Sequence, residues 1–179
     1  MVRLFVALDL PAQLRERLRL LTGAKLPGAR WVPPENMHLT LRFVGEVDHG
    51  RADDIDAALA GISARGFSLT FAGLGVFESG RRLHALWVGV ERSPALEHLR
   101  AKIESAVVRA GCAPERRKFS PHVTLARLDA PEPDKLGSFL HTHGLVRIGP
   151  VPVEHFTLFS SRLGRDGAHY VAEADYALQ

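Results

Sequence analysis

Two segments of the sequence carry a histidine and a threonine separated by one apolar residue. The first is NMHLTLRFVG, with His38 and Thr40, and the second is SPHVTLARLD, with His122 and Thr124. In an extended strand, alternate side chains point to opposite faces of the sheet. Each histidine therefore shares a face with its threonine, while apolar residues line the other face. The pattern predicts two strands that each present an imidazole and a hydroxyl on one side.

Two such pairs suit acid–base chemistry at a phosphodiester. One imidazole takes a proton from the nucleophile, while the other, in its protonated form, donates a proton to the leaving oxygen. Histidine can fill both roles because its pKa lies near neutrality. The threonine hydroxyls can donate hydrogen bonds to the non-bridging oxygens, where negative charge develops. Such a site requires neither a metal nor a cofactor.

A third His-x-Thr triplet, HFTL, begins at His155. A chain of this composition is expected to contain about 0.3 such triplets by chance, so three is an excess. His38 and His122 are 84 positions apart, but the position 84 before His155 is Phe71, inside an ordinary strand pattern. We therefore expect His155 to be structural or peripheral, although the sequence alone leaves open which two of the three motifs act.

The segments around the two matched motifs repeat along the chain. LFVALDLPAQLRERL, from Leu4, is similar to LWVGVERSPALEHL, from Leu86. Each has an apolar strand-like run, an acidic residue and then a proline that opens a helical pattern. Each histidine motif is followed by another helical pattern, at roughly 51–62 and 132–141, and then by further strand-like runs.

This repetition predicts an α+β fold made of one domain over residues 1–179. We expect two pseudo-symmetric lobes, roughly 1–80 and 84–179, of mostly antiparallel sheet backed by helices, with a central groove between them. Two copies are too few for a solenoid, which needs at least three repeats. A pseudo-twofold would bring the two His/Thr pairs to opposite sides of the groove.

Because it carries these two motifs, the sequence resembles the two-histidine (2H) phosphoesterase superfamily, which is named for its paired H-x-T/S motifs. Within it, the chain is similar to the bacterial and archaeal RNA 2′,3′-cyclic phosphodiesterases, historically called 2′–5′ RNA ligases. The resemblance covers nearly the full length and is carried by RLFVALDLP, WVPPENMHLTLRFVGEV, LWVGV and RKFSPHVTLARL.

The resemblance implies hydrolysis of a terminal 2′,3′-cyclic phosphate to a 2′-phosphomonoester. His38 would be the proton donor to the departing 3′-oxygen, and His122 would activate the attacking water. Thr40 and Thr124 would hold the phosphate. The implied partner is RNA with a 2′,3′-cyclic phosphate end, or a cyclic nucleotide, without a cofactor, a metal or a protein partner.

Two arginines near the motifs are predicted to bind substrate. Arg127 lies five positions after His122, so strict alternation places it on the opposite face, and a bulge at the strand end would return it to the groove. The resemblance favours a phosphate contact, and a solvated arginine is the alternative. Arg42 lies four positions after His38 and shares its face under strict alternation, with a salt bridge at the sheet surface as the alternative.

Other residues offer weaker signals for nucleic-acid binding. Basic side chains in SGRRLH and ERRKF could contact a phosphate backbone, or could belong to solvated loops. Three aromatic residues could stack on an exposed base, or could belong to the core; these are Trp31, Phe119 and Tyr170.

The composition narrows the class of protein. The net charge is +3 and only four of the 23 basic residues are lysines, a bias that suits phosphate recognition but also arises from genome composition. The single cysteine, Cys112, excludes a disulfide framework and a cysteine-based zinc site. The first apolar run is interrupted by Asp9 and Pro11, which is atypical of a signal peptide or membrane span. We expect a cytoplasmic monomer.

Two other functions fit the same groove. The reverse reaction would join a 2′,3′-cyclic end to a 5′-hydroxyl, which is a 2′–5′ RNA ligase activity. A non-catalytic RNA or nucleotide-binding module would use the arginines alone, but it has no evident need for two histidines at matched positions.

Overall fold

The computed structural model describes residues 1–179 and has an α+β fold. Its strands are β1 (Val2–Asp9), β2 (Ala29–Trp31), β3 (His38–Val47), β4 (Phe67–Ser79), β5 (Arg82–Val90), β6 (His122–Leu128), β7 (Arg147–Val153), β8 (His155–Gly164) and β9 (Gly167–Ala177). Its helices are α1 (Ala12–Leu21), α2 (His49–Ala60), α3 (Pro94–Arg109) and α4 (Pro133–His143), and a short 3-10 turn covers Pro34–Asn36. The predicted fold class is confirmed.

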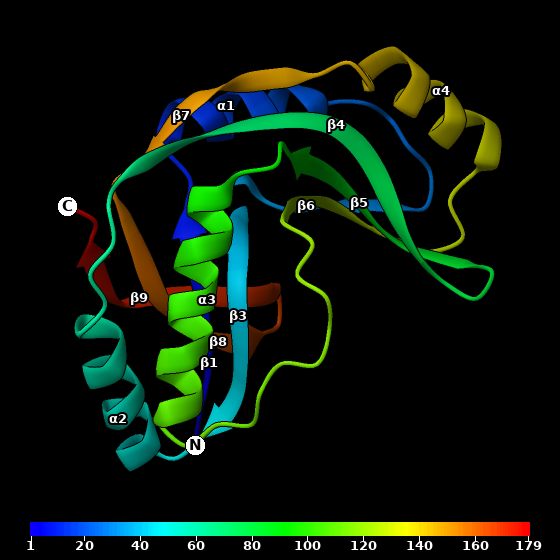
Figure 1. Ribbon diagram of the computed structural model, residues 1–179. Coiled ribbons are helices and arrows are strands. Elements are labelled where there is room, and N and C mark those ends of the chain that lie inside the picture. Colours follow the sequence, from blue (N-terminus) through cyan, green and yellow to red (C-terminus); the bar gives the residue numbers. More distant parts are fainter.

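The strands follow the order β7-β4-β5-β6-β3-β1-β8-β9, and β2 pairs with the end of β6. Every pairing is antiparallel. The strands β3 and β6 are central neighbours, joined through the register pair of Leu39 with Val123. The two strands that carry the matched histidine motifs therefore meet in the middle of the sheet (Figure 1).

The helices cover the two halves of the sheet separately. Helices α2 and α3 lie side by side along β1 and β3, whereas α1 and α4 lie at the other end, near β7 and β4 (Figure 1). Helix α3 begins at Pro94, and the Ser93 hydroxyl accepts a hydrogen bond from the Leu96 amide at 3.2 Å, which caps its first turn. Buried side chains from both halves form one continuous core. None of the four helices has the length and apolar character needed to cross a membrane.

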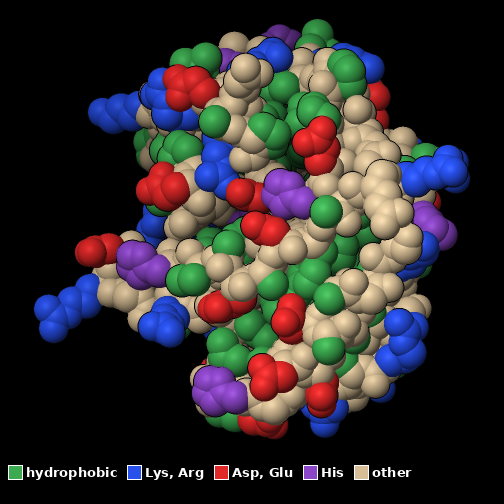
Figure 2. Space-filling view, turned by 90° about the vertical axis from the view of Figure 1, so that its left-hand side faces the viewer, with side chains coloured by type: hydrophobic (Ala, Val, Ile, Leu, Met, Phe, Trp, Pro, Cys, Tyr) green, Lys and Arg blue, Asp and Glu red, His purple; other side chains and the backbone are tan.

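One face of the molecule is mixed in charge. In Figure 2, acidic side chains are spread over the middle of this face, and most lysine and arginine side chains stand toward its edges. A nucleic-acid backbone is attracted by a continuous basic surface. The charges on this face are mixed, so it does not offer a continuous basic surface to a nucleic-acid backbone.

Candidate active site

The central strand pair brings the two histidines into one region. Leu39 and Val123, which face each other across β3 and β6, are fully buried, while His38 and His122 on the opposite face are partly exposed. The positive charge of His122 contributes to lowering the pKa of His38, so the two rings are electrostatically coupled. The threonines Thr40 and Thr124 are partly exposed on the same face as their histidines.

Both imidazoles are held by the same local contact. The Nδ1 of His38 donates to the carbonyl of Asn36 at 2.8 Å, and the Nδ1 of His122 donates to the carbonyl of Ser120 at 2.7 Å. Because a carbonyl oxygen can only accept, Nδ1 carries the hydrogen in both rings. Each ring therefore presents its Nε2 for proton transfer.

Aromatic side chains surround both rings. Phe5 and Tyr170 pack against His38, with ring centroids 4.9 and 5.2 Å away. Phe77 meets His122 edge-on at 4.7 Å. Loss of water around an imidazole disfavours its charged form, so these contacts make both histidines easier to deprotonate than a histidine in water.

The two histidines differ in their charged neighbours. Burial lowers the pKa of His38, while its backbone hydrogen bond and the Asp9 carboxylate raise it. Burial also lowers the pKa of His122, where the backbone hydrogen bond opposes the effect and the Arg127 guanidinium adds to it. His38 thus has one neighbouring carboxylate, Asp9, that favours its protonated form and is opposed by Arg15 and His122, whereas the charged neighbour of His122, Arg127, only disfavours its protonated form.

Replacing Asp9 with asparagine is expected to shift the pH dependence of catalysis. Asp9 lies opposite His38 in the β1–β3 ladder and pairs with Arg15. Without the carboxylate, the pKa of His38 falls further, because Arg15 then acts unopposed. If His38 must be protonated, the basic limb of the pH profile of kcat/KM moves to lower pH and the acidic limb stays in place.

The matched control for this change is Glu91→Gln. Glu91 directly follows β5, in the same way that Asp9 is the last residue of β1. Glu91 pairs with Arg147 and does not contribute to the pKa of His122. The Glu91→Gln profile should coincide with wild type. A basic limb that is unmoved in Asp9→Asn would contradict the assignment of His38 as the acid.

A β-bulge directs Arg127 to the histidine face. In the β5–β6 ladder, Trp87 pairs with Thr124 and Leu86 pairs with Ala126, so Leu125 has no partner. The extra residue shifts the alternation by one position. Ala126 is buried and Arg127 is exposed, on the side of Thr124, where its charge reaches His122.

A bulge at the equivalent position of β3 leaves most of the Arg42 side chain buried. Val6 pairs with Arg42 and Ala7 with Thr40, which leaves Leu41 without a partner. The Arg42 side chain is only 6% exposed, and its Nε donates to Glu104 of α3 at 2.5 Å. Strict alternation fails at the bulge, so the Arg42 side chain is largely buried, although Arg42 still lines the pocket beside His122 together with Thr40. Its predicted contact with substrate stays a prediction.

Each of the three nitrogens of the Arg42 guanidinium donates to a protein group. Besides Glu104, the guanidinium donates to the backbone carbonyls of Phe43 and Ala113. These contacts tie β3 to α3 and to the segment that follows α3. Arg42 therefore has a structural role through a buried salt bridge, and its predicted contact with substrate stays a prediction.

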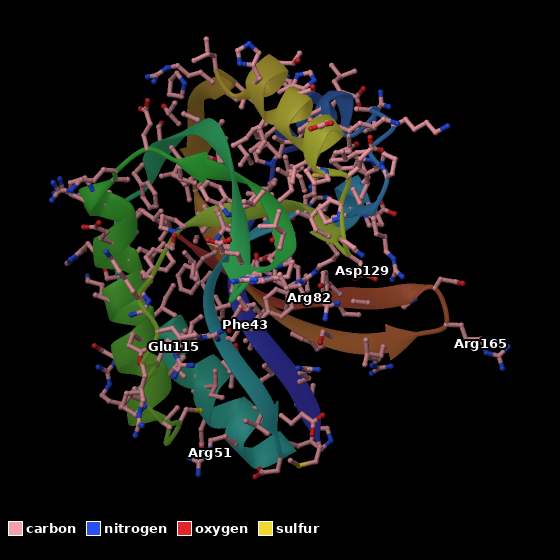
Figure 3. All side chains as sticks on the ribbon, turned by 90° about the vertical axis from the view of Figure 1, so that its right-hand side faces the viewer. Phe43, Arg51, Arg82, Glu115, Asp129 and Arg165 are labelled. Carbon is pink, nitrogen blue, oxygen red and sulfur yellow. The ribbon has the colours of Figure 1, made fainter.

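Phe43 takes the position that sequence reasoning gave to Arg42. Its side chain is 54% exposed, and it lies in the middle of the molecule below the hairpin tip that carries Arg82 (Figure 3). Phe43 was missed because alternation placed it in the core. The repeat contained the signal, since Phe43 lies 84 positions before Arg127 and each follows its histidine by five positions.

A pocket of about 360 Å³ opens beside His122. Its walls come from β3, from the β4–β5 hairpin, from α3 and from the segment between α3 and β6, near Glu115 in Figure 3. The lining residues are Thr40, Leu41, Arg42, Phe43, Phe77, Glu78, His84, Arg100, Glu115, Arg117, Lys118, Phe119, Ser120 and His122. The volume is within the range of roughly 300–1,000 Å³ for small-molecule sites.

The third motif lies apart from this pocket. His155 is exposed at the start of β8, next to Ala177 of β9. The Thr157 hydroxyl is buried and donates to Asp175 at 2.6 Å. The threonine of this motif is therefore occupied by a structural contact, which agrees with the expectation for His155.

The remaining candidates divide between core and surface. Trp31 donates from its indole to the carbonyl of Ala24 at 3.2 Å and packs against the core, while Phe119 borders the pocket. Arg82 forms an exposed ion pair with Asp129 at 3.2 Å. Of the three aromatic candidates, Phe119 and Tyr170 thus lie near the histidines.

Comparison with known proteins places this geometry in a family. Residues 8–87 and again residues 88–170 match the family model described as LigT like Phosphoesterase, and each match contains one of the paired histidine motifs. The RNA 2′,3′-cyclic phosphodiesterase of Aeropyrum pernix is 38% identical over 141 residues, covering 78% of this chain and 80% of that protein. The Escherichia coli protein of the same name is 32% identical over 185 residues, covering 98% of this chain and 96% of that protein.

Comparison with solved structures supports the same family. The crystal structure of E. coli LigT complexed with 3′-AMP superposes with a TM-score of 0.80 at 30% identity, covering 99% of this chain and 98% of that chain. The predicted family is confirmed. The chain belongs to the LigT-like phosphoesterase family of two-histidine phosphoesterases.

Proposed function

We propose that this protein hydrolyses the terminal 2′,3′-cyclic phosphate of RNA to a 2′-phosphomonoester. The observation that carries the proposal is the pair of imidazoles on adjacent central strands, each held through Nδ1 with Nε2 free. The names of the A. pernix and E. coli relatives support the same activity, as does the 3′-AMP held by E. coli LigT. Because the two rings supply both proton transfers, the proposed reaction needs no metal.

In the proposed reaction, the Nε2 of His122 takes a proton from a water molecule. The water oxygen forms a bond to phosphorus, and the bond between phosphorus and the 3′-oxygen breaks. The imidazolium of His38 donates its Nε2 proton to the departing 3′-oxygen. The electrostatic difference between the rings supports this direction, since Asp9 favours the protonated form of His38 and Arg127 disfavours that of His122.

The phosphate would be held by groups on the same face. Thr40 and Thr124 can each donate a hydroxyl hydrogen bond to a non-bridging oxygen, and the Arg127 guanidinium can neutralise the charge that develops there. Arg127 makes no ion pair with an acidic residue, so its charge is available to an anion.

Phe43 is proposed to stack on the base of the terminal nucleotide, because it is exposed and borders the pocket that contains His122. Base–aromatic stacking contributes about 1–3 kcal/mol per base. Phe43→Ala is therefore expected to raise KM for a short RNA with a cyclic end by roughly tenfold, with a smaller effect on kcat. Phe43→Tyr keeps the aromatic ring and should retain most of the affinity; equal losses in both variants would exclude stacking.

The ligase and binding alternatives are separated by one assay. An RNA with a 2′,3′-cyclic end is incubated with and without a second RNA that has a 5′-hydroxyl, and all products are resolved. Conversion to a monophosphate in both reactions supports the proposed hydrolase. A joined product that forms at the expense of the monophosphate would favour the ligase, and tight binding without either product would favour the binding module.

A further inference from the structure

Besides the largely buried Arg42, three cationic side chains line the pocket and have no part in the reaction proposed above. Arg100 comes from α3, and Arg117 and Lys118 come from the segment between α3 and β6. We call these three residues the basic wall. His122, Thr40 and this wall line the same pocket, so a ligand bound at His122 can reach the wall.

The charge of the basic wall is poorly compensated. Lys118 forms no ion pair, and the nearest carboxylate to Arg117 is Glu115, whose oxygens are 3.4 and 3.5 Å away from a guanidinium that is 78% exposed. Such long, exposed contacts contribute little. Arg100 lies 3.7 Å from Glu104, but that carboxylate already accepts the closer hydrogen bond from Arg42. The wall therefore retains net positive charge.

Arg100 also has an unused donor. Its Nε is buried and has no hydrogen-bond partner in the protein. The guanidinium is held over the ring of Phe119, 5.5 Å from the ring centroid, which limits its freedom to turn toward water. A buried donor without a partner costs free energy. Phosphate oxygens are the acceptors that arginine and lysine side chains suit best.

We propose that the basic wall binds the phosphate on the 5′ side of the terminal nucleotide. This inference rests on the proposed function. With the cyclic phosphate at the histidines and the base on Phe43, the 5′-oxygen is the remaining point at which the terminal nucleoside continues into the chain. The enzyme then distinguishes an RNA end from a free cyclic nucleoside phosphate through a second phosphate contact.

The test compares three substrates that share one terminal nucleoside. The first is a nucleoside 2′,3′-cyclic phosphate, the second carries an additional 5′-phosphate, and the third is a dinucleotide with the same cyclic end. Wild type is expected to act on the second and third with kcat/KM at least about tenfold above the first, because each offers the wall a charged phosphate. The substrate with the larger gain identifies whether the wall prefers a terminal phosphate or an internucleotide diester.

The variants assign this gain to the wall. In the double variant Arg117→Ala/Lys118→Ala, the loss on the second and third substrates should exceed the loss on the first by about tenfold, and the excess should shrink at high salt. Arg116→Ala is the matched control, because Arg116 is a neighbouring arginine that does not line the pocket. The ratios of kcat/KM between the three substrates should be the same for Arg116→Ala as for wild type.

Two results would overturn the inference in distinguishable ways. Equal kcat/KM on all three substrates, or a gain that the double variant keeps, would reject the phosphate contact and leave the hydrolase intact. Failure of wild type to hydrolyse any of the three would reject the proposed function and the inference with it.

Discussion

Replacing either His38 or His122 with alanine is expected to lower kcat/KM on an RNA 2′,3′-cyclic end by roughly 10²–10⁴-fold, the usual contribution of one general acid or base. The two losses should be comparable in size, because both rings lie on the central strands with Nε2 free. The double variant should lose little beyond the larger single loss, since the two proton transfers belong to one step.

The control for this experiment is His155→Ala. His155 belongs to the same His-x-Thr pattern, but it is exposed at the start of β8 and does not line the pocket. Its kcat/KM should remain close to wild type, and all three variants should show the circular dichroism and unfolding midpoint of the wild-type fold. An active His38→Ala or His122→Ala enzyme, or an inactive His155→Ala enzyme, would contradict the assignment of the site.

Replacing Arg42 with alanine is expected to lower the free energy of unfolding by about 3–5 kcal/mol, as removal of one partner from a buried ion pair does. Glu104 would keep its charge in a site where its side chain is 17% exposed, with only the Glu115 amide and the more distant Arg100 left to contact it. Two backbone carbonyls would also lose their donor. The loss follows from uncompensated burial rather than from any contact with substrate.

Urea unfolding of Arg42→Ala beside Arg82→Ala measures this difference. Arg82 also pairs with a carboxylate, that of Asp129, but both side chains are largely exposed, so its removal should change stability little. The Arg42→Ala protein that remains folded should have the same KM as wild type. A stable Arg42→Ala protein with a raised KM would instead return Arg42 to the groove.

Strict alternation correctly predicts which side chains are buried along β3 as far as Leu41 and along β6 as far as Leu125. Up to these positions, buried leucine or valine residues separate the histidine and the threonine, as the sequence predicts. The bulges at Leu41 and Leu125 then reverse the faces. The bulge in β6 places Arg127 on the histidine face, whereas the bulge in β3 leaves the Arg42 side chain largely buried. A single sequence does not reveal where a ladder gains an extra residue, because the bulge depends on the partner strand.

Local patterns also predicted the helices well. The helix expected at roughly 51–62 runs from His49 to Ala60, and the one expected at 132–141 runs from Pro133 to His143. The contacts that shape the site join distant parts of the chain and leave no local signal. Asn36, for example, donates to the carbonyl of Ala168 at 3.0 Å, which ties the segment before the first motif to the β8–β9 turn. The division into two lobes, roughly 1–80 and 84–179, stays a prediction.

The electrostatic difference between the rings likewise requires the fold. In the sequence, Asp9 is the acidic residue after an apolar run, and Glu91 holds the same place in the second half. The fold places Asp9 opposite His38 but leaves Glu91 paired with Arg147. A symmetric sequence pattern thus gives two histidines in unequal surroundings, which is what a reaction with one acid and one base requires.

The most direct test of the central claim is the identity of the product formed in ¹⁸O-labelled water with EDTA present. The substrate is a short RNA that ends in a 2′,3′-cyclic phosphate, and the product is analysed by mass spectrometry and by separation of the 2′- and 3′-phosphate isomers. We expect chelator-resistant turnover to a 2′-phosphate that contains one ¹⁸O atom. A 3′-phosphate product would contradict the proposed departure of the 3′-oxygen, and turnover that EDTA abolishes would contradict catalysis by two histidines alone.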